Sequence, residues 1–416
     1  MPAVSEAERR GLSSAWLVVL VALISMLAPF SIDTYLPSFP AIEADLGVSR
    51  EWLTQSLSVY LGCFALATLV WGPLADRFGR RKVILFSMAG YFLAALLCAL
   101  AMDYHWLLIG RALQGVMAAG SVVASRAMIR DYFQGAEAQK AIALVMMLFT
   151  VAPAIAPIIG GWLEVHSGWR SVFYFLGGYA LLIGLFFAVK IPETQPPHTV
   201  QSIRPADLLV SYAHSLRHPV FLRLVVLQGL LIGGFFVYVA SSASLIFDHL
   251  HLQEEDFWRF FVPVVSGILV GSMLSHRFSH RLSAKALVTI ALGMGAMAVA
   301  ANLLLEGLIA PGIFWVIAPL VLYSLGFALA NPGLSILALD CLPNKRGMAA
   351  SVQSLFQMGT AGLVAALVVP HVHHSLFLMA LSQGIMLATA LVLWFSIWQH
   401  KVFIELNRRQ FEESSQ

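Results

Sequence analysis

Residues 72–82 read Gly-Pro-Leu-Ala-Asp-Arg-Phe-Gly-Arg-Arg-Lys, and this polar stretch interrupts a long apolar region. Apolar runs flank it at about 52–75 and 83–102. A bilayer core takes about 20 apolar residues of helix, so the stretch is expected to be a loop between two membrane spans. Gly79 permits a tight turn, and the four basic side chains predict that the loop lies on the cytoplasmic side.

The composition of the chain agrees with this interpretation. Hydrophobic residues make up 59% of the 416 residues and charged residues only 11%, whereas soluble domains have about 25% charged residues. So few charges cannot coat a soluble surface of this size. The composition therefore excludes a cytosolic enzyme, a nucleic-acid binder and a disordered chain, and it predicts a polytopic membrane protein.

The hydrophobic pattern predicts an all-α membrane protein with twelve transmembrane helices. The expected spans lie at about 13–36, 52–75, 83–102, 106–129, 139–162, 168–189, 219–247, 257–276, 285–306, 312–340, 347–370 and 374–398. Positive charges alternate with these spans. Of the 25 lysines and arginines, 21 fall on the side of the N-terminus, Arg111 lies within a span, and three lie on the opposite side. Both termini are therefore expected to be cytoplasmic.

The chain is expected to have two halves. A proline-rich polar stretch at 191–218 predicts a cytoplasmic linker between a six-helix bundle at 1–190 and a second at 219–398, with a cytoplasmic tail at 399–416. Arg77, Phe78 and Arg81 recur 200 residues later as Arg277, Phe278 and Arg281. Such a repeat is typical of transporters that rock two bundles about a central site.

Spans 4 and 5 carry residues that are unusual in a membrane helix. Span 4 contains Arg111, Gln114 and Gly115. A buried arginine normally faces a cavity or a partner, and snorkelling to a surface is the alternative. Residues 152–161 in span 5 read Ala-Pro-Ala-Ile-Ala-Pro-Ile-Ile-Gly-Gly. Small residues let helices approach closely and prolines kink them, so an ordinary packing face is the alternative there.

These patterns resemble those of a known family. The loop at 72–82 resembles the signature between spans 2 and 3 of the major facilitator superfamily, and Leu107, Arg111, Gln114 and Gly115 resemble its span 4 motif. Residues 152–161 resemble its antiporter motif, with alanine replacing glycine at 152 and 156. Residues 31–37, Ser-Ile-Asp-Thr-Tyr-Leu-Pro, resemble an element of twelve-span drug:proton antiporters, most of all the bicyclomycin-resistance (Bcr/CflA) subfamily.

Other matches to this subfamily are uneven along the chain. Gly168-Trp169-Arg170 followed by Phe173 fits it. The second half matches mainly in layout and in the short stretches 331–333 and 346–350, which are less specific. The resemblance implies the major facilitator fold, with two six-helix bundles. It also implies proton-coupled export of a small molecule by alternating access, drugs being the leading substrates. A metabolite exporter, for nucleosides, sugars or amino-acid derivatives, is the alternative.

The resemblance also implies roles for individual residues. Asp76, Arg77 and Arg81 would form a latch that stabilises the outward-open state, although a plain basic topology loop is the alternative. Arg111 would couple or gate transport. The antiporter motif points to exchange rather than symport, and it includes Pro153, Pro157, Gly160 and Gly161.

Asp33 is the predicted proton site. Among the 22 acidic residues it is the one placed clearly within a span. A carboxyl group in a low-dielectric environment can bind and release a proton near neutral pH. The alternative is a structural aspartate that caps a helix near Pro37 or pairs with Arg111.

The remaining candidates are weaker. Polar and aromatic side chains within spans either hydrogen-bond between helices or line the substrate cavity; the candidates are Tyr35, Gln114, Tyr238, Asn331 and Gln357. His371, His373 and His374 are expected in a solvent-facing loop rather than at a metal, and no metal or other cofactor is predicted. Two other classes of protein are disfavoured. The spans contain no set of metal ligands or nucleophile with base that an intramembrane enzyme would need, and the sequence shows no sizeable soluble domain that a receptor or scaffold would need. The expected partners are the small-molecule substrate, protons and membrane lipid, for a functional monomer in a bacterial plasma membrane.

Overall fold

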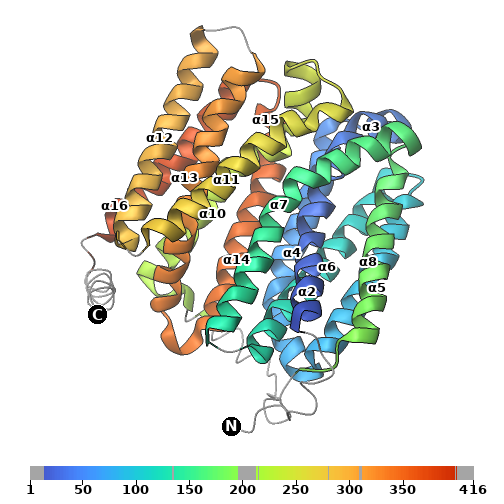
Figure 1. Cartoon of the computed structure of the whole chain (residues 1–416). Coiled ribbons are helices and arrows are strands. Elements are labelled where there is room, and N and C mark those ends of the chain that lie inside the picture. The colour runs from blue at the N-terminus through green and yellow to red at the C-terminus, as the bar shows by residue number, and fades with distance from the viewer. Residues whose placement is uncertain are drawn as a thin grey trace. The chain divides into compact units, whose positions relative to one another are not determined.

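The computed structural model describes residues 14–133, 135–194, 212–213, 215–279, 281–308, 312–398 and 400. Within these residues all regular structure is helical. The chain forms two compact units, Met1–Arg204 and Pro205–Gln416, which are described separately below (Figure 1). The predicted tail, apart from His400, and most of the predicted linker lie outside the described residues.

Twelve helical segments among the described residues are long and apolar enough to cross a membrane. This number confirms the predicted span count and the all-α fold. The segments are Ala15–Leu46, Arg50–Phe78, Arg80–Ala99, Tyr104–Tyr132, Lys140–Ser167, Arg170–Lys190, Pro219–Ala240, Glu254–Phe278, Ala284–Leu305, Ile313–Asp340, Arg346–Val372 and Leu376–Ile397.

The first unit contains six spans, the first of them in two pieces. Its elements are α2 (Ser14–Asp33), η1 (Leu36–Ser38), α3 (Phe39–Leu46), α4 (Arg50–Phe78), α5 (Arg80–Ala99), α6 (Tyr104–Tyr132), α7 (Gly135–Ser167) and α8 (Arg170–Lys190). Helix α6 packs between α4 and α5, and α2 packs along α7. Asp33 is the last residue of α2 because Pro37, four residues later, has no N–H to bond the Asp33 carbonyl.

The second unit also contains six spans. Its elements are α10 (Pro219–Ala240), the π-helical turn η2 (Ser244–His249), η3 (Glu254–Phe257), α11 (Trp258–Phe278), α12 (Ala284–Leu308), α13 (Ile313–Asp340), η4 (Pro343–Lys345), α14 (Arg346–Leu363), η5 (Val364–Val368), α15 (Val369–Val372) and α16 (Leu376–Ile397). Phe278 ends α11 as Phe78 ends α4. The repeated Arg-Phe pair therefore closes the second span of each unit.

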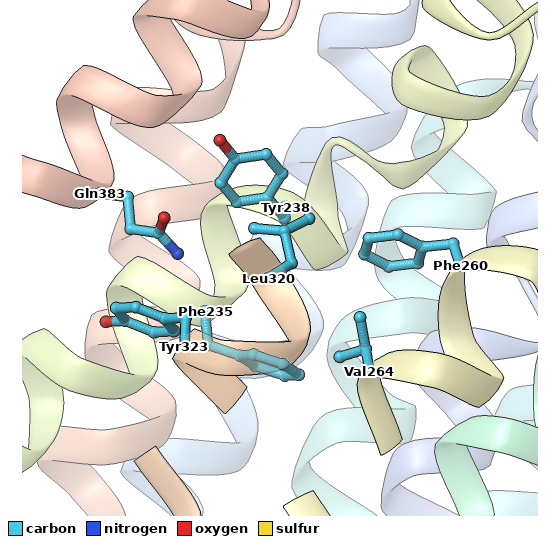
Figure 2. Close-up of a pocket in the computed structure, with 7 residues that line it drawn as sticks. All are labelled: Phe235, Tyr238, Phe260, Val264, Leu320, Tyr323 and Gln383. Atoms are coloured by element: carbon cyan, nitrogen blue, oxygen red, sulfur yellow. The ribbon is translucent and has the colours of Figure 1, made fainter. Parts of the chain in front are cut away.

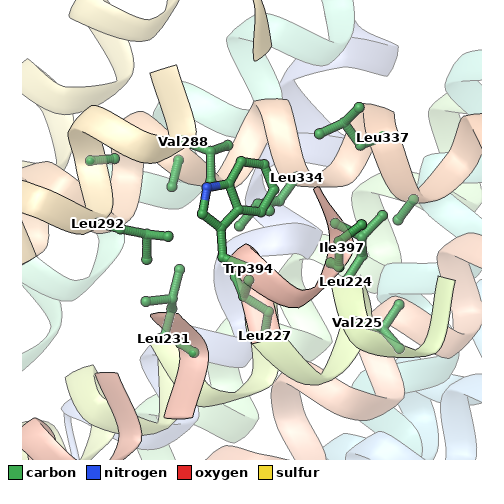
Figure 3. Close-up of a cluster of buried hydrophobic side chains, with 14 of the residues drawn as sticks. Leu224, Val225, Leu227, Leu231, Val288, Leu292, Leu334, Leu337, Trp394 and Ile397 are labelled. Carbon is green, nitrogen blue, oxygen red and sulfur yellow. The ribbon is translucent and has the colours of Figure 1, made fainter. Parts of the chain in front are cut away.

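The core of the second unit surrounds Trp394 of α16. This indole is fully buried among side chains of α10, α12 and α13, including Leu227, Val288 and Leu334 (Figure 3). Its Nε1 donates a hydrogen bond to Thr289 Oγ1 at 3.0 Å. A buried tryptophan needs such a partner for its N–H, so the hydrogen bond fixes the ring orientation and ties α16 to α12.

Several helix ends differ from the prediction, and α10 ends at Ala240 rather than at about 247. The first span continues past residue 36 through the break to Leu46. Helix α7 runs to Ser167 instead of about 162, and it stays helical through Pro153 and Pro157. Proline removes one backbone hydrogen bond without necessarily ending a helix. The longer α7 brings Glu164 into the span.

Candidate functional site

Asp33 lies where the first span breaks. Its side chain is 3% exposed, and its carboxyl group has no hydrogen bond or ion pair with any residue that the structure describes. The next residue is fixed, because Thr34 N and Oγ1 both donate to Phe30 O, at 3.2 and 2.6 Å. The carboxyl group is therefore buried on a rigid turn without a bonded partner.

Arg111 of α6 is fully buried in the same unit. Its Nη1 donates to Gln114 Oε1 at 2.8 Å, and its Cζ lies 4.5 Å from the ring centroid of Tyr60 and 4.9 Å from that of Tyr35. Nε and Nη2 have no hydrogen-bond partner among the described residues. The burial excludes snorkelling, and the side chain makes no ion pair with Asp33 in this structure.

Gly115 explains how Arg111 reaches the Tyr60 ring. A Cβ at residue 115 would lie 2.3 Å from the Tyr60 carbonyl oxygen and 3.1 Å from Phe64 N. Only glycine permits this approach of α6 to α4. Arg111 lies one helical turn earlier on α6, so the close contact sets its guanidinium beside the Tyr60 ring.

Tyr35 is enclosed by aromatic side chains. Its hydroxyl shares a 3.0 Å hydrogen bond with Ser56 Oγ, and its ring centroid lies 5.0 Å from that of Phe39 and 5.5 Å from that of Phe173. These separations are typical of favourable aromatic pairs. Phe173 belongs to the stretch at 168–173 that sequence comparison singled out, and here it supports the Tyr35 ring.

Trp169 and Arg170, in the same stretch, hold α3, the second piece of the first span. Asp45 Oδ2 accepts from Trp169 Nε1 at 3.1 Å and from Arg170 Nη1 at 2.6 Å. Arg170 also donates to the carbonyl of Ala101 at 3.1 Å. The start of α8 therefore fixes α3, which follows the Asp33 break.

The antiporter motif packs against that break. A Cβ at residue 160 would lie 2.2 Å from Thr34 O and 2.8 Å from Thr34 C and Cα. Ala156 and Ala152, one and two turns earlier on the same face of α7, are fully buried. The small residues thus let α7 pack closely on the first span, immediately beside Asp33.

Glu164 is a second carboxyl group in this region, and it was missed because the predicted span ended at residue 162. It follows Gly160 by one turn of α7, and its Oε2 atom is buried. The signal was available in the sequence, since residue 164 continues the four-residue spacing of the small residues.

The loop between α4 and α5 holds a network of charges. Arg80 makes an ion pair with Asp76 and donates from Nε to Asp131 Oδ2 at 3.0 Å. Arg81 donates to the carbonyls of Ala188 and Ile191 at the end of α8, at 2.7 and 2.8 Å. This network therefore joins the ends of four helices in the first unit, α4, α5, α6 and α8. Arg77 instead contacts an aromatic ring, with its Cζ 5.3 Å from the ring centroid of Phe78.

Glu193 completes this network and was not singled out from the sequence. Its Oε1 accepts from Arg80 N at 3.0 Å and its Oε2 from Arg81 N at 3.1 Å. The carboxylate therefore caps the N-terminus of α5, where negative charge is favourable.

The cavity candidates of the second unit do not line one pocket. Tyr238 lines a small cavity of about 10 Å³ together with Phe235, Phe260, Val264, Leu320, Tyr323 and Gln383 (Figure 2). That volume holds about one water molecule. Asn331 and Gln357 are half-buried and are not among its lining residues. Tyr238 also accepts a 2.5 Å hydrogen bond from Asn302 Nδ2.

The histidines of the second unit make local contacts. His249 Nε2 lies 2.9 Å from the His373 carbonyl oxygen, and His373 Nδ1 lies 3.1 Å from Ser244 Oγ. Among the described residues no three His, Cys, Asp or Glu side chains are grouped so as to hold a metal ion. These contacts instead connect the turn after α10 to the end of the eleventh span.

Comparison with known proteins gives the family. Residues 21–367 match the model of the Major Facilitator Superfamily. The chain belongs to the Major Facilitator Superfamily. It is therefore a multi-pass membrane transporter, as the sequence predicted.

Bacterial proteins are among the relatives of this superfamily member. It is 28% identical to YdgK, an uncharacterised MFS-type transporter of Bacillus subtilis, over 85% of this chain and 88% of the relative. It is also 28% identical to the bicyclomycin resistance protein homolog of Haemophilus influenzae, over 84% and 88%. With the multidrug resistance protein MdtL of Klebsiella pneumoniae it shares 31% identity over 54% of this chain and 57% of the relative. These matches agree with the resemblance to bicyclomycin-resistance transporters.

Solved structures agree on the fold. A D-xylose-proton symporter superposes with a TM-score of 0.68 at 18% identity, over 93% of this chain and 98% of the other. An inward-facing bacterial homologue of the lysosomal transporter Spinster gives 0.66 at 18% identity, over 96% and 98%. The major facilitator fold expected from the sequence is thereby confirmed.

Proposed function

We propose that this transporter exports small drug-like molecules in exchange for protons, and that Asp33 carries the proton. One observation carries the choice of site: the Asp33 carboxyl group is buried at the break of the first span without a hydrogen bond or ion pair among the described residues. A carboxyl group in such a place can take up and release a proton without breaking a fixed ion pair. The names of the Haemophilus and Klebsiella relatives support drugs as the substrate class.

The other site residues have proposed roles in the same cycle. Arg111 gates or couples transport, supported by its complete burial and its two unpaired donors. Asp76, Arg77 and Arg81 form the latch of the loop between α4 and α5. Gly160 and its neighbours in the antiporter motif favour exchange, because they pack α7 against the segment that carries Asp33.

The proposed setting is a bacterial inner membrane with both termini in the cytoplasm, which the distribution of basic residues supports. We also propose that the monomer is the functional unit. Moving one charge across 100 mV is worth about 2.3 kcal/mol, so a proton-motive force near 150–180 mV supplies about 4 kcal/mol per proton. That energy sustains a concentration ratio of roughly 10³, so one proton site is sufficient for useful export.

A growth-inhibition assay tests the proposal. A bacterial host that lacks its own major drug pumps would express the wild type, Asp33→Asn or Asp248→Asn at equal membrane levels. Asp248 is an exposed aspartate of the second unit and serves as the matched control. The cells would be challenged with bicyclomycin and a panel of other antibiotics. The wild type and Asp248→Asn are expected to raise tolerance to at least one of these compounds, and Asp33→Asn is not.

Each other outcome contradicts part of the proposal. Equal protection by Asp33→Asn and the wild type would show export with the proton carried elsewhere. If no variant protects against any drug, the drug class is wrong, and metabolite export becomes the function to test.

A further inference from the structure

Glu164 lies on the face of α7 that is turned into the first unit. Pro157, Gly160 and Gly161 are buried on this face. The opposite face carries exposed apolar side chains: Ile155 at 40%, Ile158 at 44%, Trp162 at 56% and Val165 at 53%. A helix with 3.6 residues per turn places residue 164 on the same side as 157, 160 and 161. The carboxyl group is therefore directed into the bundle rather than toward lipid.

The surroundings of Glu164 place it next to the broken first span. Gly160, one turn earlier, contacts the Thr34 backbone, and α7 packs against both α2 and η1. Ser171 Oγ at the start of α8 donates to the carbonyl of Leu163 at 3.1 Å. This hydrogen bond holds the start of α8 against α7 at the residue before Glu164. The four residues from Gly160 to Glu164 correspond to about 6 Å along α7, so Glu164 lies just beyond the level of Asp33, toward the end of the unit where α3 lies.

The Glu164 side chain and one of its carboxyl oxygens differ in burial. The side chain as a whole is half-buried, whereas its Oε2 atom is fully buried. An ionisable residue that faces the interior of a membrane bundle is expensive and generally marks an ion or proton pathway. A group that is partly accessible at one end and buried at the other is suited to pass a proton inward.

We propose that Glu164 is a second protonation site, which takes a proton from the medium at the α3 end of the first unit before the proton reaches Asp33. The transfer is balanced: the Glu164 carboxyl group returns to a carboxylate as the Asp33 carboxylate becomes a carboxylic acid. This inference rests on the proposed proton-coupled export and adds a step to it. The motif residue Gly160 then holds the two carboxyl-bearing segments side by side.

Other charged groups near this end of the unit have separate partners or positions. Arg170 binds Asp45 and the Ala101 carbonyl. His166 stacks on Trp162 with its Nδ1 2.8 Å from the Trp162 carbonyl oxygen, on the exposed side of α7. The ionisable side chains contributed here by the elements packed against α7 are Asp33, Tyr35, Arg111, Arg170 and Tyr174.

The first test is chemical and needs no transported substrate. Dicyclohexylcarbodiimide modifies protonated carboxyl groups in apolar surroundings, and the full-length protein in liposomes would be treated over a range of pH. Mass spectrometry is expected to find modification on Glu164 and on Asp33, but not on Glu137, an exposed glutamate at the other end of α7. Glu164 left unmodified under conditions that modify Asp33 would overturn the inference.

The second test measures transport. Bicyclomycin uptake into inside-out vesicles would be driven by an imposed proton gradient, for the wild type, Glu164→Gln and the matched control Glu137→Gln. Glu164→Gln is expected to slow uptake by about 10²-fold, the lower end of the effect of losing a proton-transfer group, and to move the pH of half-maximal rate. Glu137→Gln is expected to match the wild type. A Glu164→Gln variant with the rate and pH profile of the wild type contradicts the proposal.

Two further comparisons keep the result unambiguous. If Glu164→Gln does not accumulate, Glu164→Asp retains the carboxyl group and is expected to keep carbodiimide modification at residue 164; loss of that modification in a folded variant counts against the site. If Asp33→Asn keeps proton-driven uptake, the proposed role of Asp33 fails. The carbodiimide test of Glu164 does not depend on Asp33, so it still decides whether Glu164 takes up a proton.

Discussion

The guanidinium carbon of Arg111 lies 4.5 Å from the ring centroid of Tyr60, on a neighbouring helix of the first unit. Tyr35 covers the same guanidinium at 4.9 Å. A buried arginine loses its hydration, and aromatic faces replace part of that interaction without a carboxylate. Arg111 therefore stays buried in this structure without an ion pair to Asp33, so the two side chains are not fixed to one another.

Replacement of Tyr60 tests this contact. Tyr60→Phe keeps the ring and loses the hydrogen bonds of the hydroxyl, a long one of 3.4 Å to the Ala28 carbonyl and one with Ser31, so it is expected to keep stability and transport closer to those of the wild type than a variant without the ring. Tyr60→Leu removes the ring and is expected to cost about 2 kcal/mol of unfolding free energy. Thermal unfolding in detergent measures the difference. Equal stability of the two variants would contradict a cation–π contribution.

A methyl group at Gly160 tests the close contact of α7 with the first span. Alanine normally stabilises a helix by about 1 kcal/mol relative to glycine, but here the new Cβ would meet the Thr34 backbone. Gly160→Ala is therefore expected to reduce drug export at unchanged membrane levels. Gly178→Ala in α8 is the matched control, because nothing lies within 4 Å of its added Cβ. Equal export by both variants would show that the contact is dispensable.

The sequence was sufficient for the number of spans and the all-helical fold, because hydrophobic length and the alternation of basic loops are strong, local signals. It was less reliable at helix ends. Pro37 broke the first span, yet the chain resumed as α3, and α7 continued through two prolines to Ser167. Proline affects one hydrogen bond at a time, so packing against neighbouring helices decides whether the helix continues.

The candidate site was predictable only in part, because charged residues stand out in an apolar sequence but tertiary contacts do not. Asp33 and Arg111 are conspicuous in apolar surroundings, and the structure buries both. The cover of Arg111 by Tyr60 depends on the contact of Gly115 with α4, and the capping by Glu193 joins residues more than 100 positions apart. Contacts of this kind depend on tertiary packing and leave no periodic signal in one sequence.

Glu193 provides a test of the network at the loop between α4 and α5. Its carboxylate accepts from the backbone of Arg80 and Arg81, so Glu193→Ala is expected to lower the unfolding free energy by about 1 kcal/mol, as for other lost helix caps. Glu193→Gln keeps an acceptor and should lose less. Glu255→Ala, at an exposed position of the second unit, is the control. A melting temperature of Glu193→Ala equal to that of this control would argue against a capping role.

Cys341 allows a prediction about thiol reactivity outside the spans. Burial, and to a lesser degree the negative charge of Asp340, raises the pKa of its thiol to about 12. The thiolate is the reactive form, so at pH 8 the alkylation of Cys341 is expected to be about 10³-fold slower than that of an ordinary thiol, since three pKa units change the thiolate fraction a thousandfold. The rate should rise about tenfold per pH unit toward the pKa. Iodoacetamide kinetics on a variant carrying Cys63→Ser and Cys98→Ala would measure this, with Asp340→Asn expected to react faster because the nearby negative charge is gone. A rate at pH 8 equal to that of glutathione would contradict the prediction.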